Sequence, residues 1–187
     1  MSFFGKSSRQ SRRKKDEFKA MFERKFCLAK SDPEPTFDLS GCGLETVPSA
    51  VFKFFAVLRK SALFLQILDL SRNQLTSLPD SICELKSLEN MNLSWNKLSK
   101  LPVNIGRLSK LSRLNVSNNA ELKTLPSSLH HARVLVEINW SENQDFTFPP
   151  QDIMRQGPAR ILSSLLKVSF AIYSSLSYQR VARIKKN

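Results

Sequence analysis

Cysteine is scarce in this chain of 187 residues, with three in all, at Cys27, Cys42 and Cys83. An odd number of cysteines without paired clusters does not suit the disulfide frameworks of secreted domains. The first 30 residues are basic and polar, so we expect no cleavable signal peptide. These absences predict an intracellular protein in the reducing environment of the cytoplasm.

Histidine and glycine are also rare, which limits the chemistry that the chain can carry. The two histidines, His130 and His131, have no Cys, Asp or Glu at ligand spacing, so we expect surface or packing roles and no metal site. Two of the five glycines, Gly41 and Gly43, lie inside a predicted turn, and no glycine loop of the phosphate-binding kind is present. A CxxC pair and a nucleophile elbow are missing as well. We therefore predict no catalytic residue, no cofactor and no enzymatic activity in this chain.

A long uninterrupted apolar run is missing too. The segment from Ile161 to Tyr178 approaches the length that a bilayer requires, but Lys167 and six serines interrupt it. We therefore expect no transmembrane helix.

Positive charge, by contrast, is abundant, and it is concentrated at the two ends. Of the net +13, residues 1–30 contribute ten Lys or Arg against three acids, and residues 153–187 contribute seven bases and no acid. The remaining middle, with twelve bases and thirteen acids, is nearly neutral. Contact of the basic termini with an anionic membrane surface is one interpretation. We expect no nucleic-acid partner, because no groove-reading or base-stacking motif accompanies the charge.

The middle of the chain repeats itself. The sequence LDLSRNQLTSLPDSI returns as MNLSWNKLSKLPVNI and as LNVSNNAELKTLPSSL, with Asn73, Asn96 and Asn119 at intervals of 23 and Asn143 a further 24 residues on. A weaker first unit begins at residue 37 and has Cys42 in place of the asparagine, and a degenerate fifth unit begins at residue 136. This period is typical of leucine-rich repeats.

The physics of the unit predicts the fold class. Leu68 and Leu70 of a short strand point inward, Asn73 bonds the backbone of the neighbouring turn, and the LPxxI stretch returns on the other side. A single repeat cannot bury both of its faces, so neighbouring repeats must stack. We predict an α/β leucine-rich repeat solenoid with short parallel strands on the concave face and capping helices at both ends.

Composition and periodicity also suggest the boundaries of these parts. An apolar stripe through Phe18, Met21 and Phe22 predicts an N-terminal helix, which we interpret as a cap on the first repeat. The last twenty residues show neither the repeat nor a clean helical pattern. We predict a basic disordered arm at 1–15, an N-terminal capping helix at 16–30, a leucine-rich repeat domain of about five repeats at 36–150, a C-terminal capping helix at 151–167 and a divergent basic tail at 168–187.

The strand register predicts which side chains face a partner. Residues that alternate with the buried leucines point to the concave surface, including the serine that follows each strand (Ser40, Ser71, Ser94, Ser117 and Ser141). Tryptophan and arginine dominate many interfaces, so we take Trp95, Arg72 and Arg113 as anchors. An alternative is that Trp95 lies flat over a neighbouring repeat. The full predicted binding set is Asp69, Arg72, Asn92, Trp95, Arg113, Asn115, Asn139 and Glu142.

Two segments outside the repeats carry a more specific resemblance. The FCLAK sequence at 26–30 and the FPPQDIMRQGPARILSSLLK sequence at 148–167 make the chain similar to the N-terminal part of the leucine-rich repeat and sterile alpha motif-containing E3 ubiquitin ligases. The resemblance covers about residues 1–167. It implies a cytoplasmic protein whose repeats recognise protein targets or bacterial surfaces and which works with ubiquitin-pathway proteins. The RING, sterile alpha motif and coiled coil of that family have no counterpart here, so the resemblance transfers no catalytic residue.

Binding, rather than catalysis, is therefore the predicted function. The first interpretation is the target-recognition part of a ligase-like protein, acting as a competitor or scaffold of a full ligase. A scaffold of small-GTPase signalling is the alternative, because Leu-Pro repeats of this length also occur there.

Overall fold

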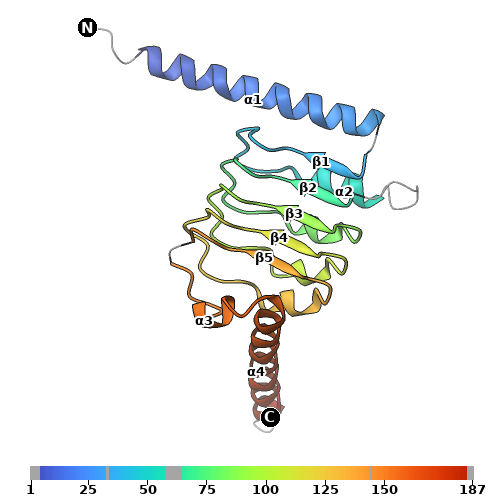
Figure 1. Cartoon of the computed structure of the whole chain (residues 1–187), viewed down its shortest axis with the longest axis vertical. Coiled ribbons are helices and arrows are strands. Elements are labelled where there is room, and N and C mark those ends of the chain that lie inside the picture. The colour runs from blue at the N-terminus through green and yellow to red at the C-terminus, as the bar shows by residue number, and fades with distance from the viewer. Residues whose placement is uncertain (1–4, 33, 58–64, 144, 185–187) are drawn as a thin grey trace.

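The repeats form a single curved stack, seen in a computed structural model that describes residues 5–32, 34–57, 65–143 and 145–184 (Figure 1). Five strands pair in parallel in their sequence order, with each strand in register with the next. The strands are β1 (Thr36–Asp38), β2 (Ile67–Asp69), β3 (Asn90–Asn92), β4 (Arg113–Asn115) and β5 (Glu137–Asn139). This parallel sheet of five strands, together with the helices, confirms the predicted α/β leucine-rich repeat solenoid.

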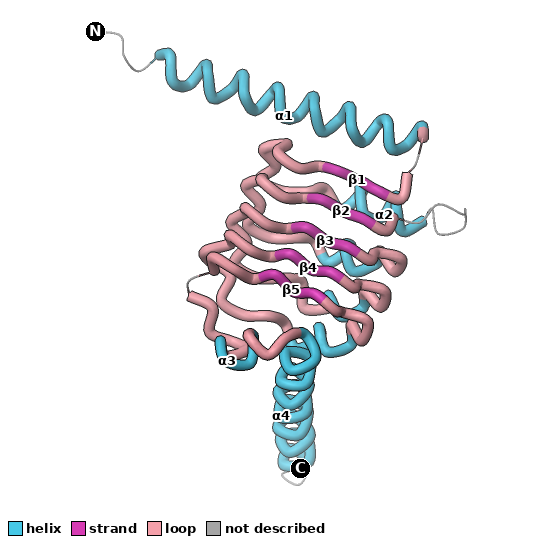
Figure 2. The backbone as a smooth tube through the Cα atoms, viewed as in Figure 1, coloured by secondary structure: helices cyan, strands magenta, loops and turns pink. Residues whose placement is uncertain are grey.

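The opposite side of the stack consists of short helical segments (Figure 2). One is the helix α2 (Ser49–Val57), and three are 3₁₀ turns: η2 (Asp80–Glu84), η3 (Ile105–Arg107) and η4 (Ser127–His131). The helix α2 lies in the connection between β1 and β2, which is longer than the connections that follow it. Residues 58–64 of this connection lie outside the described residues.

The interior between the two sides is a continuous leucine core. Leu68, Leu70 and Leu75 are at most 1% exposed, and the later repeats place their equivalents the same way. Gly106 shows how closely neighbouring repeats approach, because an added Cβ there would lie 1.8 Å from the Ser128 carbonyl oxygen. The core therefore follows from the repeat pattern alone.

A ladder of buried asparagines holds the turns together. The Asn73 amide donates to the Leu39 and Leu70 carbonyls at 2.9 Å, and its Oδ1 accepts from the Leu44 N–H at 2.9 Å. Asn96 and Asn119 repeat this arrangement one and two turns later. Each asparagine thus bonds backbone groups of its own turn and of the neighbouring turn in the interior, where polar groups need partners.

The helix α1 (Gly5–Ser31) lies across the first repeat. Phe26 packs edge-on against Phe54 with ring centroids 5.6 Å apart, and it also contacts Phe37. The helix begins at Gly5, inside the segment expected to be a disordered arm, because residues 6–31 contain no proline or glycine to stop it. Its N-terminal end extends past the edge of the repeats in Figure 1.

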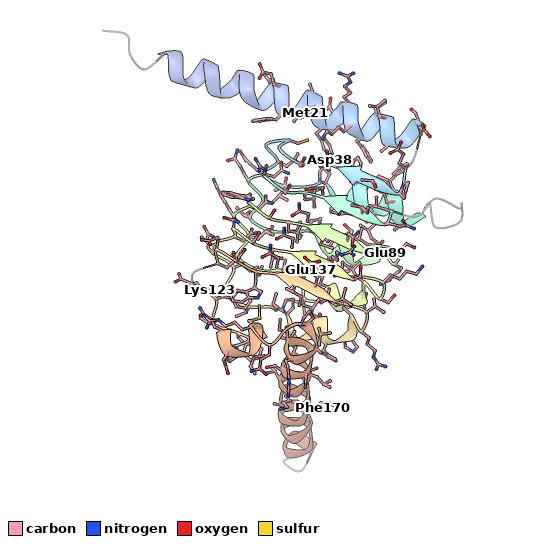
Figure 3. The ribbon with its side chains drawn as sticks, viewed as in Figure 1. Met21, Asp38, Glu89, Lys123, Glu137 and Phe170 are labelled. Carbon is pink, nitrogen blue, oxygen red and sulfur yellow. The ribbon has the colours of Figure 1, made fainter. Side chains whose placement is uncertain are left out.

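Two helices follow the last strand: α3 (Gln151–Met154) and α4 (Pro158–Ile184). Ile161 and Leu165 of α4 are at most 1% exposed against the end of the core, whereas Phe170 is 67% exposed on the part that projects outward (Figure 3). The helix continues through most of the segment expected to be a divergent tail. Within the described residues, no helix combines the length and apolar character needed to cross a bilayer.

Candidate functional site

One column of side chains follows the concave face, with one member per repeat. In each repeat the Oδ1 of this residue accepts the N–H of the serine two positions later, at 2.7 to 3.2 Å. An Asx turn of this kind fixes the bend that follows the strand. The column consists of Asp38, Asp69, Asn92, Asn115 and Asn139. One oxygen of each side chain is therefore committed to the fold.

The second polar atom of each residue in the column differs along the solenoid. Asp38 forms an ion pair with Lys25 of α1 at 3.5 Å, and Asp69 accepts a hydrogen bond from the Asn92 amide at 3.0 Å. For the Nδ2 atoms of Asn115 and Asn139, the described part of the chain provides no partner. Both oxygens of Asp38 and of Asp69 are therefore already bonded near β1 and β2, whereas free amide donors remain near β4 and β5.

Asp38 shows how α1 influences this face. Burial would raise the pKa of its carboxyl, but hydrogen bonds from Ser40 and the charge of Lys25 outweigh burial, and the pKa lies below its ordinary value. The carboxylate therefore stays ionised and paired with α1 at neutral pH. Because the folded-state pKa is lowered, the stabilisation from this pair is present at neutral pH and is lost as the pH falls through the folded-state value.

Arg113 occupies the centre of a shallow hollow on the same face. Its guanidinium lies 3.5 Å from the Glu137 carboxylate and donates to the Asn90 Oδ1 at 3.4 Å. Both partners are adjacent strand residues in register with Arg113. The hollow, with a volume of about 230 Å³, also includes five of the predicted binding residues: Asp69, Asn92, Arg113, Asn115 and Asn139.

The other three predicted residues lie in a separate column along the turns after the strands. Arg72, Trp95 and Glu142 all have left-handed backbone, with φ between 56° and 60°, and Asn118 shares it. The equivalent residue of the first repeat is Gly41, at φ 63°. Glycine and asparagine adopt this conformation at little cost, whereas a bulky side chain does so at about 1–2 kcal/mol. The tryptophan at this strained position is 57% exposed, so core packing does not explain its presence.

One part of the predicted face is wrong. Ser40 is partly exposed and Ser141 is exposed, whereas Ser71, Ser94 and Ser117 are only 5 to 7% exposed and do not present side chains to a partner. Their N–H groups turn inward to close the Asx turns, and the hydroxyls of Ser94 and Ser117 bond the same Oδ1 atoms. The period of two ends with the strand, because the chain turns at this serine. The ion pair between Lys25 and Asp38 had no sequence signal, since it depends on how α1 lies.

The histidines lie on the opposite side, in η4. The Nδ1 atom of His130 lies 2.6 Å from the Ser127 carbonyl, and that of His131 lies 3.0 Å from the Ser128 carbonyl. Within the part of the chain that the structure describes, no three His, Cys, Asp or Glu side chains gather as metal ligands would.

Comparison with known proteins supports the repeat assignment. The leucine rich repeat family matches residues 36–98, which span the first strands and their turns. No curated protein matches the chain.

Proposed function

We propose that this chain is a protein-binding module whose partner contacts the concave face around Trp95 and Arg113. Leucine-rich repeat domains commonly mediate protein–protein interaction. The observation that carries the proposal is the exposed indole of Trp95 at a position where the backbone favours glycine or asparagine. Strained residues of this kind persist where the side chain serves a function.

The chemistry of the face suits a polar protein surface. Arg113 is held in a defined orientation by Glu137 and Asn90, and the amides of Asn115 and Asn139 add two donors beside it. Pre-oriented groups lose little conformational entropy on binding. A partner segment rich in backbone carbonyls or carboxylates would match these donors.

We further propose that the partner is a target of ubiquitination, and that the chain is the recognition part of an E3 ligase-like protein acting in the cytoplasm. The resemblance of residues 26–30 and 148–167 to that ligase family supports this proposal. The three cysteines are all free thiols, as a reducing compartment requires. After Cys83 the sequence has no cysteine, so the zinc ligands of a RING are not in these 187 residues.

A cross-linking capture experiment in cells tests the binding face. The wild-type chain would be compared with a concave variant carrying Trp95→Asn and Arg113→Gln, and with a control variant carrying Lys110→Gln and Arg133→Gln at exposed positions off the concave face. We expect the wild type and the control variant to capture the same protein and the concave variant to lose it. Equal capture by all three would contradict the proposal.

The ligase-like role has its own test. Overexpression of the chain should lower ubiquitination of the captured protein, measured by ubiquitin-remnant mass spectrometry, and the concave variant should not. Unchanged ubiquitination would refute the ligase-like role and leave the binding face standing.

A further inference from the structure

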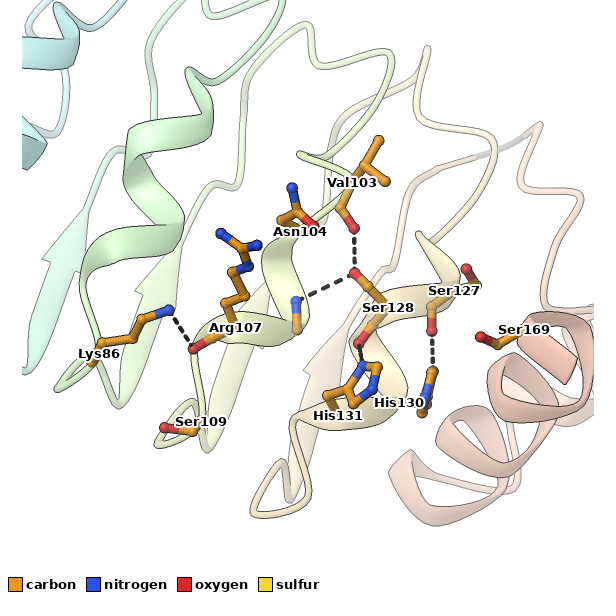
Figure 4. Close-up of a pocket in the computed structure, with 11 residues that line it drawn as sticks. Lys86, Val103, Asn104, Arg107, Ser109, Ser127, Ser128, His130, His131 and Ser169 are labelled. Atoms are coloured by element: carbon orange, nitrogen blue, oxygen red, sulfur yellow. Dashed lines mark hydrogen bonds between the residues drawn. The ribbon is translucent and has the colours of Figure 1, made fainter. Parts of the chain in front are cut away.

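A second hollow lies on the side away from the sheet, between η3, η4 and α4 (Figure 4). Its volume is about 800 Å³, within the usual size of small-molecule sites. Arg107 and Asn104 contribute from η3 and the turn before it, His130 and His131 from η4, and Ser169 from α4. Three elements distant in sequence therefore converge on one pocket.

The charge of this pocket has a single sign. Lys86 and Arg107 line it, and no Asp or Glu does. For the Arg107 guanidinium, the described residues supply no carboxylate partner. The Lys86 ammonium is fixed at the rim, where it donates to the Cys83 carbonyl at 2.8 Å and the Arg107 carbonyl at 3.1 Å. Such an environment favours an anion.

The hydrogen bonds of the two histidines determine which ring nitrogen remains available. A carbonyl oxygen can only accept, so each Nδ1 carries a proton and donates to Ser127 or Ser128. The Nε2 atoms have no partner among the described residues. The two ring centroids lie 3.8 Å apart with their planes tilted by 35°, so the two imidazoles pack against each other at the pocket.

Hydroxyl groups complete the lining. Ser128 is already committed, since its hydroxyl donates to the Val103 carbonyl and accepts from the Gly106 N–H. The hydroxyls of Ser109, Ser127 and Ser169 have no hydrogen-bond partner in the described part of the chain. They can donate to the oxygens of a bound anion.

We propose that this pocket binds a small phosphate monoester. Arg107 supplies a permanently charged guanidinium, which can bind two phosphate oxygens at once. The second proton of a phosphate monoester dissociates near neutral pH, with a pKa of about 6. A histidine Nε2 and a phosphate oxygen can therefore share one proton, whichever of the two carries it. The exposed Val103 at the rim offers an apolar contact to the organic group of an ester.

Isothermal titration of the full chain at constant ionic strength tests the proposal, with phenyl phosphate, inorganic phosphate and sulfate as probes. At neutral pH we expect the affinity to decrease from phenyl phosphate to inorganic phosphate to sulfate, because sulfate has no proton to share with a histidine Nε2. Equal affinity for phenyl phosphate and inorganic phosphate would assign the site to free phosphate and overturn the preference for an ester. Equal affinity for all three anions would overturn the proposal as a whole.

Matched variants separate a defined site from general attraction to a chain of net charge +13. Arg107→Gln should weaken phenyl phosphate binding at least about ten-fold, whereas Arg133→Gln, an exposed arginine outside the pocket, should change it less than about two-fold. His130→Asn with His131→Asn keeps a side-chain N–H near each Nδ1 position but removes Nε2, and it should abolish the preference for phosphate over sulfate. Equal weakening by Arg107→Gln and Arg133→Gln would show only diffuse charge attraction.

Amide chemical shifts, recorded by NMR in a titration with phenyl phosphate, provide an independent readout. Shifts confined to η3, η4 and the start of α4 support the site. Shifts centred on α1 would refute it.

Discussion

The buried asparagine ladder permits a quantitative test at Asn96. Its Oδ1 accepts the Leu75 N–H at 3.0 Å, and its amide donates to the carbonyls of Leu70, Leu93 and Ser94 at 2.9 to 3.3 Å. Each of these carbonyls keeps another donor when Asn96 is removed: the Asn73 amide for Leu70, the Asn119 amide for Leu93 and a backbone N–H for Ser94. The Leu75 N–H keeps none, so it is the one group that the substitution leaves unpaired in the described structure.

The magnitude follows from this asymmetry. Asn96→Ala leaves one buried donor unsatisfied, which costs about 1–3 kcal/mol. Asn96→Asp has nearly the same shape and keeps the acceptor for Leu75, but it directs a carboxylate oxygen at carbonyl oxygens and buries a charge. An unpaired buried charge costs several kcal/mol more than a missing hydrogen bond. We therefore expect the isosteric Asp variant to be less stable than the Ala variant at pH 7.

Urea denaturation followed by circular dichroism measures both free energies of unfolding. Near pH 4 the difference in stability between the Asp and Ala variants should become smaller or change sign, because the introduced carboxyl group, once protonated, can donate to a carbonyl again. Asn115→Asp is the matched control: it makes the same chemical change at the Asx column, where Asp38 and Asp69 already occupy the equivalent position. We expect it to cost less than about 0.5 kcal/mol. If Asn96→Asp is as stable as Asn96→Ala at pH 7, the assigned roles of the two amide atoms are wrong.

Three further predictions concern the turns and the thiols. Trp95→Asn should keep the free energy of unfolding within about 1 kcal/mol of the wild type, because relief of the left-handed backbone strain offsets the lost contacts. A larger loss, measured by urea denaturation, would mean that the indole mainly stabilises the neighbouring repeats. By the same assay, Gly43→Ala should lower the free energy of unfolding more than Gly41→Ala does. The two glycines have nearly the same φ, 62° at Gly43 and 63° at Gly41, but only a Cβ at Gly43 would meet the Phe18 ring, at 2.3 Å. Equal losses for the two variants would mean that α1 moves freely. Burial, and after it the charge of Asp80, raises the pKa of Cys83 to about 11. At pH 8 iodoacetamide should therefore label Cys83 only after unfolding, whereas the exposed Cys27 of α1 should react in the native protein. Labelling of Cys83 in the native protein, detected by mass spectrometry, would contradict this.

Most of the architecture can be predicted from the repeat pattern, because each position of the repeat has a single physical role. The inward leucines and the ladder asparagines recur with the period of one turn, so reading one repeat predicts the next. The strand register, and with it the Arg113 hollow, follows from the same period. What the pattern could not predict are contacts between the repeats and the two long helices, such as that of Phe26 with Phe54 or Lys25 with Asp38.

The lengths of those helices were misjudged for a related reason. An amphipathic stripe indicates where a helix packs, and in α1 it marks Phe18, Met21 and Phe22, which lie against the repeats. The helix itself extends wherever no residue stops it, which the stripe does not report. The stretch before Phe18 and the continuation of α4 after Lys167 contain no proline or glycine beyond the helix start at Gly5, so no residue there interrupts the helical hydrogen bonding.

Recognition by this face is constrained by what the fold has already used. In the Asx column, one oxygen of each residue accepts a hydrogen bond within its own turn. The second oxygen of Asp38 is paired with Lys25, and that of Asp69 accepts from Asn92. A partner bound as proposed would therefore meet mainly the amides of Asn115 and Asn139, the Arg113 guanidinium and Trp95. Because these groups lie toward β3, β4 and β5, binding at the concave face should depend on the later repeats, while the first repeat and α1 chiefly stabilise the stack.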